Sequence, residues 1–210
     1  SLQCIKVTPY RHETDLYLNV EQIIPTPEAE ELMISINAKA KEEKETVGKQ
    51  HSRYRVRLQY WEQAVIAFHK NDCHLFENIS PSKDQWISAG SGVSGCNFTL
   101  IFGKSESRVE VIMGRSDLKE NKLIFDALAS QKVILEEKFG HPLIWYRNDD
   151  KKVSRIQYPL DIDGYDKENW PTLIDWMVKH MTRLEKTFKQ PLLEAAEQMK
   201  KTLQEPVNTV

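Results

Sequence analysis

Two pairs of β-rich runs alternate with helical segments in the second part of this chain, and this order constrains the fold most. Residues 97–102 and 108–113 are joined by a polar stretch of hairpin length, and residues 143–147 and 153–159 repeat the arrangement. Hairpins join antiparallel strands, and an antiparallel sheet needs helices on one face only. The order predicts an α+β fold, with an antiparallel sheet built from hairpins, amphipathic helices mainly on one face and a long C-terminal helix.

The helical segments are indicated by large apolar residues that recur at helical spacing. Residues 52–69 carry such a stripe, consisting of Tyr54, Leu58, Trp61, Val65 and Phe68. A second helix is expected to run from the N-cap residue Asp117 to Gly140. The C-terminal stripe extends from Ile174 to Phe188, and Pro191 is expected to interrupt that helix before another begins.

The N-terminal part differs from the rest in pattern and in charge. Residues 4–8 and 16–20 predict two short strands, and Thr26-Pro27-Glu28 predicts the start of a helix. Residues 37–50 contain almost no large apolar side chain. We therefore expect two parts: residues 1–50, with a strand pair, a helix and a charged linker, and residues 51–210, the α+β domain. Because two strands alone are marginally stable, the first part is interpreted as a possible tail of an upstream domain.

A glycine series with the spacing G-x-G-x-x-G lies between residues 86 and 102. A dinucleotide-binding loop of this spacing precedes a helix, whose N-terminus holds the pyrophosphate. Here the glycines lead into residues 97–102, which predict a strand, and no Walker lysine or kinase triplet accompanies them. Nucleotide binding and any other cofactor are therefore not expected. The two interpretations left open are a tight turn and a nest of backbone N–H groups that binds an anion.

The anion-binding interpretation selects a set of candidate residues. Strand alternation places Arg108 and Glu110 on one face, although a charged face is more often simply solvated. The candidate anion- or ligand-binding residues are Gly90, Ser91, Gly92, Ser94, Gly95, Arg108, Glu110, Lys122 and Arg155.

Catalytic and metal-binding constellations are not evident in the sequence. Each nuclease-like acidic–lysine triplet lies in a predicted helix, linker or turn rather than on a strand, so a nuclease site is not expected. The cluster of His69, Asp72, Cys73 and His74 is interpreted as a helix end rather than a metal site. Three widely spaced cysteines indicate neither a disulfide framework nor a zinc ribbon. No catalytic residue is therefore assigned.

The overall charge limits the classes of partner. The chain has 29 basic and 31 acidic residues and a net charge of -2, which excludes a globally basic nucleic-acid coat. The notable basic run, formed by Lys49, His51, Arg53, Arg55 and Arg57, is expected at the start of a solvated helix. No apolar run is long enough to span a membrane, and we expect a cytoplasmic location without membrane contact.

A series of short motifs between residues 54 and 190 resembles an uncharacterised prokaryotic family known only as a domain of unknown function. The series includes Tyr60-Trp61, Ser91-Gly92-Val93-Ser94-Gly95, Arg108-Val109-Glu110-Val111, Asn121-Lys122 and Ser154-Arg155-Ile156. In that family the domain often follows a segment resembling restriction endonucleases and occurs in predicted DNA-defence proteins. The resemblance implies that such a domain occurs next to nuclease-like segments, and it assigns no catalytic residue to this chain.

Three functions are compared on this basis. The first is a non-catalytic accessory module of a DNA-processing or restriction-type system, with DNA or a nuclease-like domain or subunit as its partner. The second is a protein-interaction or oligomerisation module, for which the apolar stripe of the C-terminal helix is the motive. The third is a small-molecule binder or enzyme around Ser91, Ser94 and Glu110.

Overall fold

The chain consists of two compact units, Ser1–Ser52 and Arg53–Val210. The computed structural model describes residues 4–12, 15–24, 51–71 and 73–204. The helix expected from Thr26 and the charged stretch 37–50 lie outside the described residues.

The described part of the first unit is a two-stranded antiparallel ribbon, β1 (Cys4–His12) and β2 (Asp15–Ile24). Both strands were predicted, and both are longer than the apolar runs that indicated them. Val7 pairs with Val20 on one face of the ribbon, whereas Thr8 pairs with Asn19 on the other. The ribbon is therefore amphipathic.

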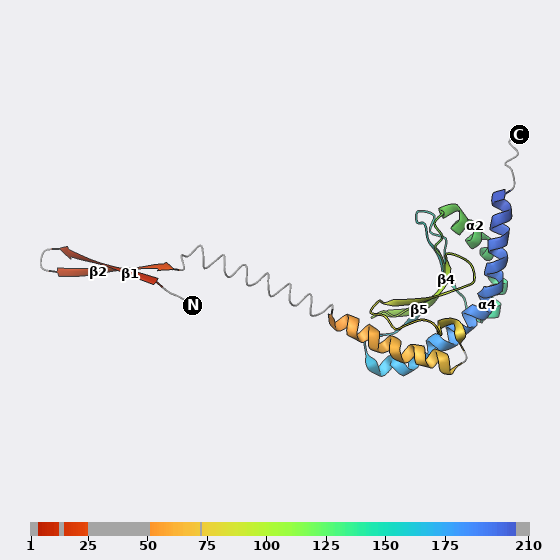
Figure 1. The fold of residues 1–210 in the computed structure, drawn as a ribbon, viewed down its shortest axis with the longest axis horizontal. Coiled ribbons are helices and arrows are strands. Elements are labelled where there is room, and N and C mark those ends of the chain that lie inside the picture. Colours follow the sequence, from red (N-terminus) through yellow and green to blue (C-terminus); the bar gives the residue numbers. More distant parts are fainter. Residues whose placement is uncertain (1–3, 13–14, 25–50, 72, 205–210) are drawn as a thin grey trace, which may run out of the picture. The chain divides into compact units, whose positions relative to one another are not determined.

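The second unit contains a five-stranded antiparallel sheet with the order β3-β4-β5-β7-β6. Two of its strands, β4 and β5, are labelled in Figure 1. The strands are β3 (Trp86–Gly90), β4 (Cys96–Ile101), β5 (Glu106–Met113), β6 (Ile144–Tyr146) and β7 (Ser154–Asp161). The antiparallel sheet and its two predicted hairpins are confirmed. The edge strand β3 was missed, because the sequence there was interpreted only as an approach to the glycine series.

Helices pack on one face of this sheet (Figure 1). They are the helix over residues 51–70, α2 (Leu118–Ala129), α3 (Lys132–Phe139) and α4 (Trp170–Gln204), with the short 3-10 turns η1 (His74–Phe76) and η2 (Lys167–Asn169). The side chains of Val109, Val111 and Met113 alternate along β5 toward this layer and are fully buried. The opposite face of the sheet carries no described helix.

The first helix is rotated relative to its predicted stripe. Leu58 is 39% exposed, whereas Tyr60 and Ala64 are fully buried beside the correctly predicted Trp61 and Phe68. The ring of Tyr60 stacks on Phe102 with 3.9 Å between centroids. This aromatic contact fixes which side of the helix faces the sheet.

The helix expected from Asp117 to Gly140 is two helices. Asp117 caps α2 by accepting a hydrogen bond from the amide of Glu120, as predicted. Ser130 Oγ then donates to the carbonyl of Ala127, and Gln131 leaves the helical region with φ -110° and ψ 17°. The side chain of Ser130 thus competes with helix continuation.

The C-terminal helix is not interrupted at Pro191. Helix α4 is 35 residues long and contains Pro191, which removes one backbone donor. Figure 1 shows that the helix bends. Phe188 and Leu192 on either side of the proline are both fully buried. Burial of this stripe along the unit outweighs the cost of the proline, which is about 3 kcal/mol.

Candidate functional site

The face of the sheet opposite the helices contains a hollow of about 410 Å³. We call its lining the open-face site. Its residues come from β3, β4, β5 and β7, and they are Trp86, Ser88, Asn97, Thr99, Ile101, Arg108, Glu110, Ile112 and Arg155. The site combines exposed aromatic surface, hydroxyl and amide groups, and charged side chains.

Strand register brings the polar side chains of this site together. Thr99 lies opposite Glu110 in the β4–β5 pair, and Glu110 lies opposite Gln157 in the β5–β7 pair. Two residues further along β5, Ile112 lies opposite Arg155. Because side chains two residues apart on a strand share a face, Arg108, Glu110 and Arg155 converge although they are distant in sequence.

Arg108 is held between two carboxylates on the floor of the site. Its Nε donates to Glu110 Oε2 at 3.0 Å and its Nη1 donates to Glu106 Oε1 at 3.0 Å. Burial opposes the charge of Arg108, but the hydrogen bonds that it donates to Glu110 and Glu106 outweigh this effect and raise the pKa of the guanidinium. Two carboxylates therefore neutralise this cation, and Glu110 is only 2% exposed.

Arg155 is a cation that has no such carboxylate partner among the described residues. Its guanidinium carbon lies 5.5 Å from the ring centroid of Tyr146, a cation–π contact. Its Nε is buried and has no hydrogen-bond partner among the described residues. An unpaired buried donor costs about 1–3 kcal/mol, so the guanidinium of Arg155 is not fully satisfied within the sheet.

Aromatic and hydroxyl groups surround these charges. Trp86 on the edge strand β3 is 50% exposed, and Tyr146 on the opposite edge strand β6 is 40% exposed. The hydroxyls of Ser88 and Thr99 are hydrogen-bonded at 2.6 Å. The sheet therefore offers a flat aromatic surface at each edge and polar groups between them.

The glycine series forms the turn between β3 and β4. As the sequence predicted, a strand rather than a helix follows it. The amides of Ser91 and Cys96 donate to Cys96 O and Val93 O, and the amide of Val93 donates to Ser91 Oγ. The hydroxyl of Ser91 in turn donates to Cys96 O. These donors are engaged within the turn, which leaves them unavailable to an anion.

The other candidates of this series have structural contacts. Gly92 and Gly95 adopt positive φ values of 91° and 74°. The carbonyl of Ser94 accepts a hydrogen bond from Arg115. Gly90 ends β3 and is not among the residues that line the open-face site.

Lys122 lies on α2, outside the open-face site. Its ammonium contacts four oxygens, Arg147 O, Asn148 O, Lys151 O and Ser154 Oγ, at 2.6–2.9 Å. The neighbouring Asn121 donates to Lys152 O and to Arg115 O. This pair fixes the β6–β7 turn to α2.

The described cysteines and the described side chains that could bind a metal give no further candidate site. Burial raises the pKa of the Cys96 thiol to about 11 and also raises the pKa of Cys73, so both thiols stay protonated near neutral pH. No group of three or more His, Cys, Asp or Glu in the described part of the chain is placed to hold a metal ion. None of the described helices is both long enough and apolar enough to cross a membrane.

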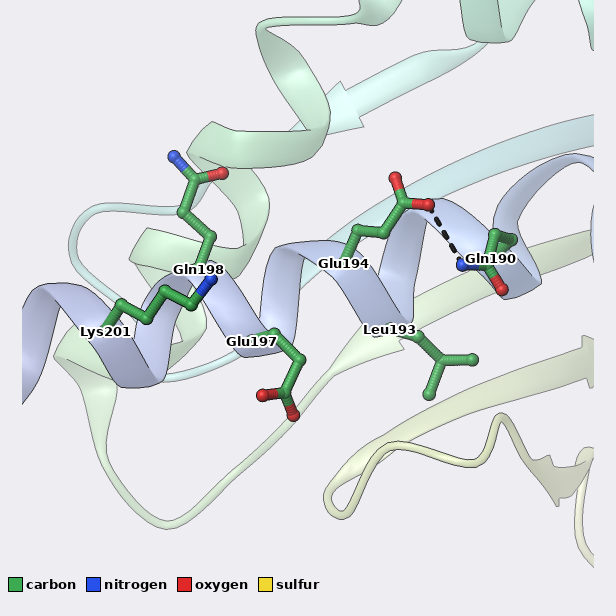
Figure 2. A pocket seen from close by; sticks show the side chains of 6 residues that line it. All are labelled: Gln190, Leu193, Glu194, Glu197, Gln198 and Lys201. Carbon is green, nitrogen blue, oxygen red and sulfur yellow. Dashed lines mark hydrogen bonds between the residues drawn. The ribbon is translucent and has the colours of Figure 1, made fainter.

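A second hollow, of about 360 Å³, lies on the outer surface of α4. Figure 2 shows that all of its labelled side chains project from this one helix and that Gln190 is hydrogen-bonded to Glu194. Its charged side chains are Glu194, Glu197 and Lys201. This surface offers no opposing wall and an excess of negative charge, so the open-face site is the better candidate.

Comparison with known families gives one match. The model of a family described as a domain of unknown function, DUF4268, matches residues 56–192. The chain belongs to this family. The match confirms the resemblance of the sequence to a domain of unknown function, and the DUF4268 region contains the whole sheet and every residue of the open-face site. No curated protein and no solved structure matches the chain.

Sequence reasoning missed Trp86, Ser88, Thr99 and Tyr146 as members of one surface. The alternation of Trp86, Ser88 and Gly90 with the buried Ile87 and Ala89 is the signal that would have found β3. The position of Tyr146 beside Arg155 depends on the β6–β7 register.

Proposed function

We propose that this chain is a non-catalytic module that contacts nucleic acid through the open-face site. The observation that carries the proposal is Arg155, a half-buried cation that lines the open-face site, has no carboxylate partner among the described residues and lies over the ring of Tyr146. A phosphate oxygen is a suitable acceptor, and arginine is the usual side chain for this contact. Exposed Trp86 supplies a surface on which a base can stack.

The setting proposed for this module is a DNA-processing or restriction-type system. The support is the family resemblance, in which the domain often follows a nuclease-like segment. The module itself would position nucleic acid for such a partner, because the described residues offer binding groups rather than a nucleophile or a metal site.

A second candidate function is a protein-interaction module, and the surface that supports it is the ribbon rather than α4. The stripe on α4 that motivated it is buried within the unit, where Leu184, Phe188 and Met199 are 2% exposed or less. The ribbon β1–β2 instead exposes Val7, Leu18 and Val20 by 53–63%. An oligomer would therefore use the ribbon rather than α4, and light scattering of the full chain reports it.

The salt dependence of binding tests the nucleic-acid proposal. Arg108 is neutralised by Glu106 and Glu110, so we expect Arg155 to make the main phosphate contact. Each phosphate contact on a single strand contributes about -0.7 to the slope of log K against log salt. We therefore expect a shallow slope of about -0.7 in a fluorescence anisotropy titration with a labelled single-stranded DNA oligonucleotide.

Arg155→Met should weaken this binding about tenfold and reduce the magnitude of the slope by about 0.7, because a charge-assisted hydrogen bond is lost. Arg55→Met is the matched control, since Arg55 is exposed on the first helix, away from the open face. A result in which Arg55→Met weakens binding and Arg155→Met does not would contradict the proposed site.

A further inference from the structure

The balance of charge on the open face restricts the form of nucleic acid that fits it. Glu110 is a carboxylate on the floor of the site, and together with Glu106 it outweighs the positive charge of Arg108. Arg155 also lines the site and brings the sum of these four charges to zero, so a sugar–phosphate backbone would meet a net negative charge only around Arg108. The backbone is therefore expected beside Arg155 rather than over Arg108, with the bases over the rest of the sheet.

Bases that stack their ring faces on protein side chains have to be unstacked and unpaired, because in a duplex these faces are covered by the neighbouring base pairs. The side chains of the site suit unpaired bases. Trp86 and Tyr146 expose ring surface at the two edges of the sheet, and Ser88, Asn97 and Thr99 lie on the strands between them. Their hydroxyl and amide groups can donate and accept hydrogen bonds with base edges.

The edges of the sheet set the length of the segment. β3 and β6 are separated by four strand intervals of about 4.8 Å, which is about 19 Å across the sheet. Modules that stack RNA on a four-stranded sheet accommodate two or three bases, so a five-stranded face of this width corresponds to about three or four. Arg155, beside Tyr146, is placed to take a phosphate at one end of such a segment.

We propose, on the basis of the proposed function, that the open-face site binds single-stranded nucleic acid in preference to duplex, with bases stacked on Trp86 and Tyr146. The distribution of charge in the site favours bases over the sheet and a phosphate beside Arg155. Affinity then depends mainly on stacking. Because Arg155 alone is expected to contact a phosphate, the dependence on salt is weaker than is usual for single-strand binders.

The test compares one labelled single strand with the duplex of the same sequence, using the full chain. We expect the single strand to bind at least tenfold more tightly, and Trp86→Ala and Tyr146→Ala each to weaken it about tenfold, since stacking on an aromatic side chain contributes that much per base. Trp86→Phe should restore most of the affinity because it keeps a ring. Tyr17→Ala, which removes a tyrosine of comparable exposure from the ribbon, is the control and should bind like the parent chain.

The outcomes separate this inference from the proposed function. If the duplex binds as tightly as the single strand and the aromatic variants bind normally while Arg155→Met is impaired, the inference is wrong and the nucleic-acid module remains. If neither form of DNA binds, both are wrong. Circular dichroism of each folded variant ensures that a loss of binding reflects the missing ring.

Discussion

Lys122→Met is expected to lower the free energy of unfolding by about 3 kcal/mol. The ammonium of Lys122 is the common donor for three carbonyl oxygens of the β6–β7 turn and for Ser154 Oγ. Methionine keeps the aliphatic stem but removes this shared donor, so Arg147 O and Asn148 O keep only the hydrogen bonds from Ser154 Oγ and from the amide of Lys151. Urea unfolding followed by tryptophan fluorescence measures the change, and all five tryptophans lie in the second unit.

The control for this variant is Lys119→Met, on the same helix. Lys119 is exposed, so its replacement should change stability by no more than about 0.5 kcal/mol. If Lys122→Met were as stable as Lys119→Met but bound nucleic acid more weakly, Lys122 would be a ligand contact rather than the structural tie described above.

Gly95→Ala is expected to lower the free energy of unfolding by about 2–3 kcal/mol. A Cβ at this position would lie 2.8 Å from Arg115 Cγ and 2.9 Å from the backbone Cα of Arg115. The φ of 74° adds strain, because residues other than glycine rarely adopt it. The same urea experiment reports the loss.

Gly90→Ala provides the matched comparison within the same glycine series. No atom lies within 4 Å of the Cβ that alanine would add there, and we expect a change within about 0.5 kcal/mol. A series that served a ligand rather than the turn would show the reverse result, with Gly95→Ala folding normally and losing only its binding.

The sequence predicted the elements of the second unit well where periodicity and capping agreed. Asp117 and Gly140 were correctly placed at helix boundaries because capping depends on local backbone geometry. The break at Ser130 was missed because the hydrogen bond from Ser130 Oγ to Ala127 O competes with a helix that the apolar spacing alone would continue. The continuity through Pro191 was missed because the burial of Phe188 and Leu192 outweighs the local cost of the proline. The exposure of Leu58 has the same origin, since the stacking of Tyr60 on Phe102 cannot be read from helical spacing.

The candidate site was predictable only in part. Alternation along β5 placed Arg108 and Glu110 on one face, and the structure adds Arg155 through strand register. The same structure places Lys122 in the support of a turn, which residue type and spacing do not reveal. Trp86 and Tyr146 are edge residues of strands that are neighbours in neither sequence nor sheet, so their shared surface follows only from the order of the strands.

The central claim is that nucleic acid lies on the open face of the sheet, and an NMR titration of the full chain with a short single strand tests it most directly. We expect chemical-shift changes to concentrate at Trp86, Thr99, Glu110 and Arg155 and their strand neighbours, with the first helix and α4 nearly unchanged. Changes confined to the basic start of the first helix, to the ribbon, or to α4 would contradict the claim.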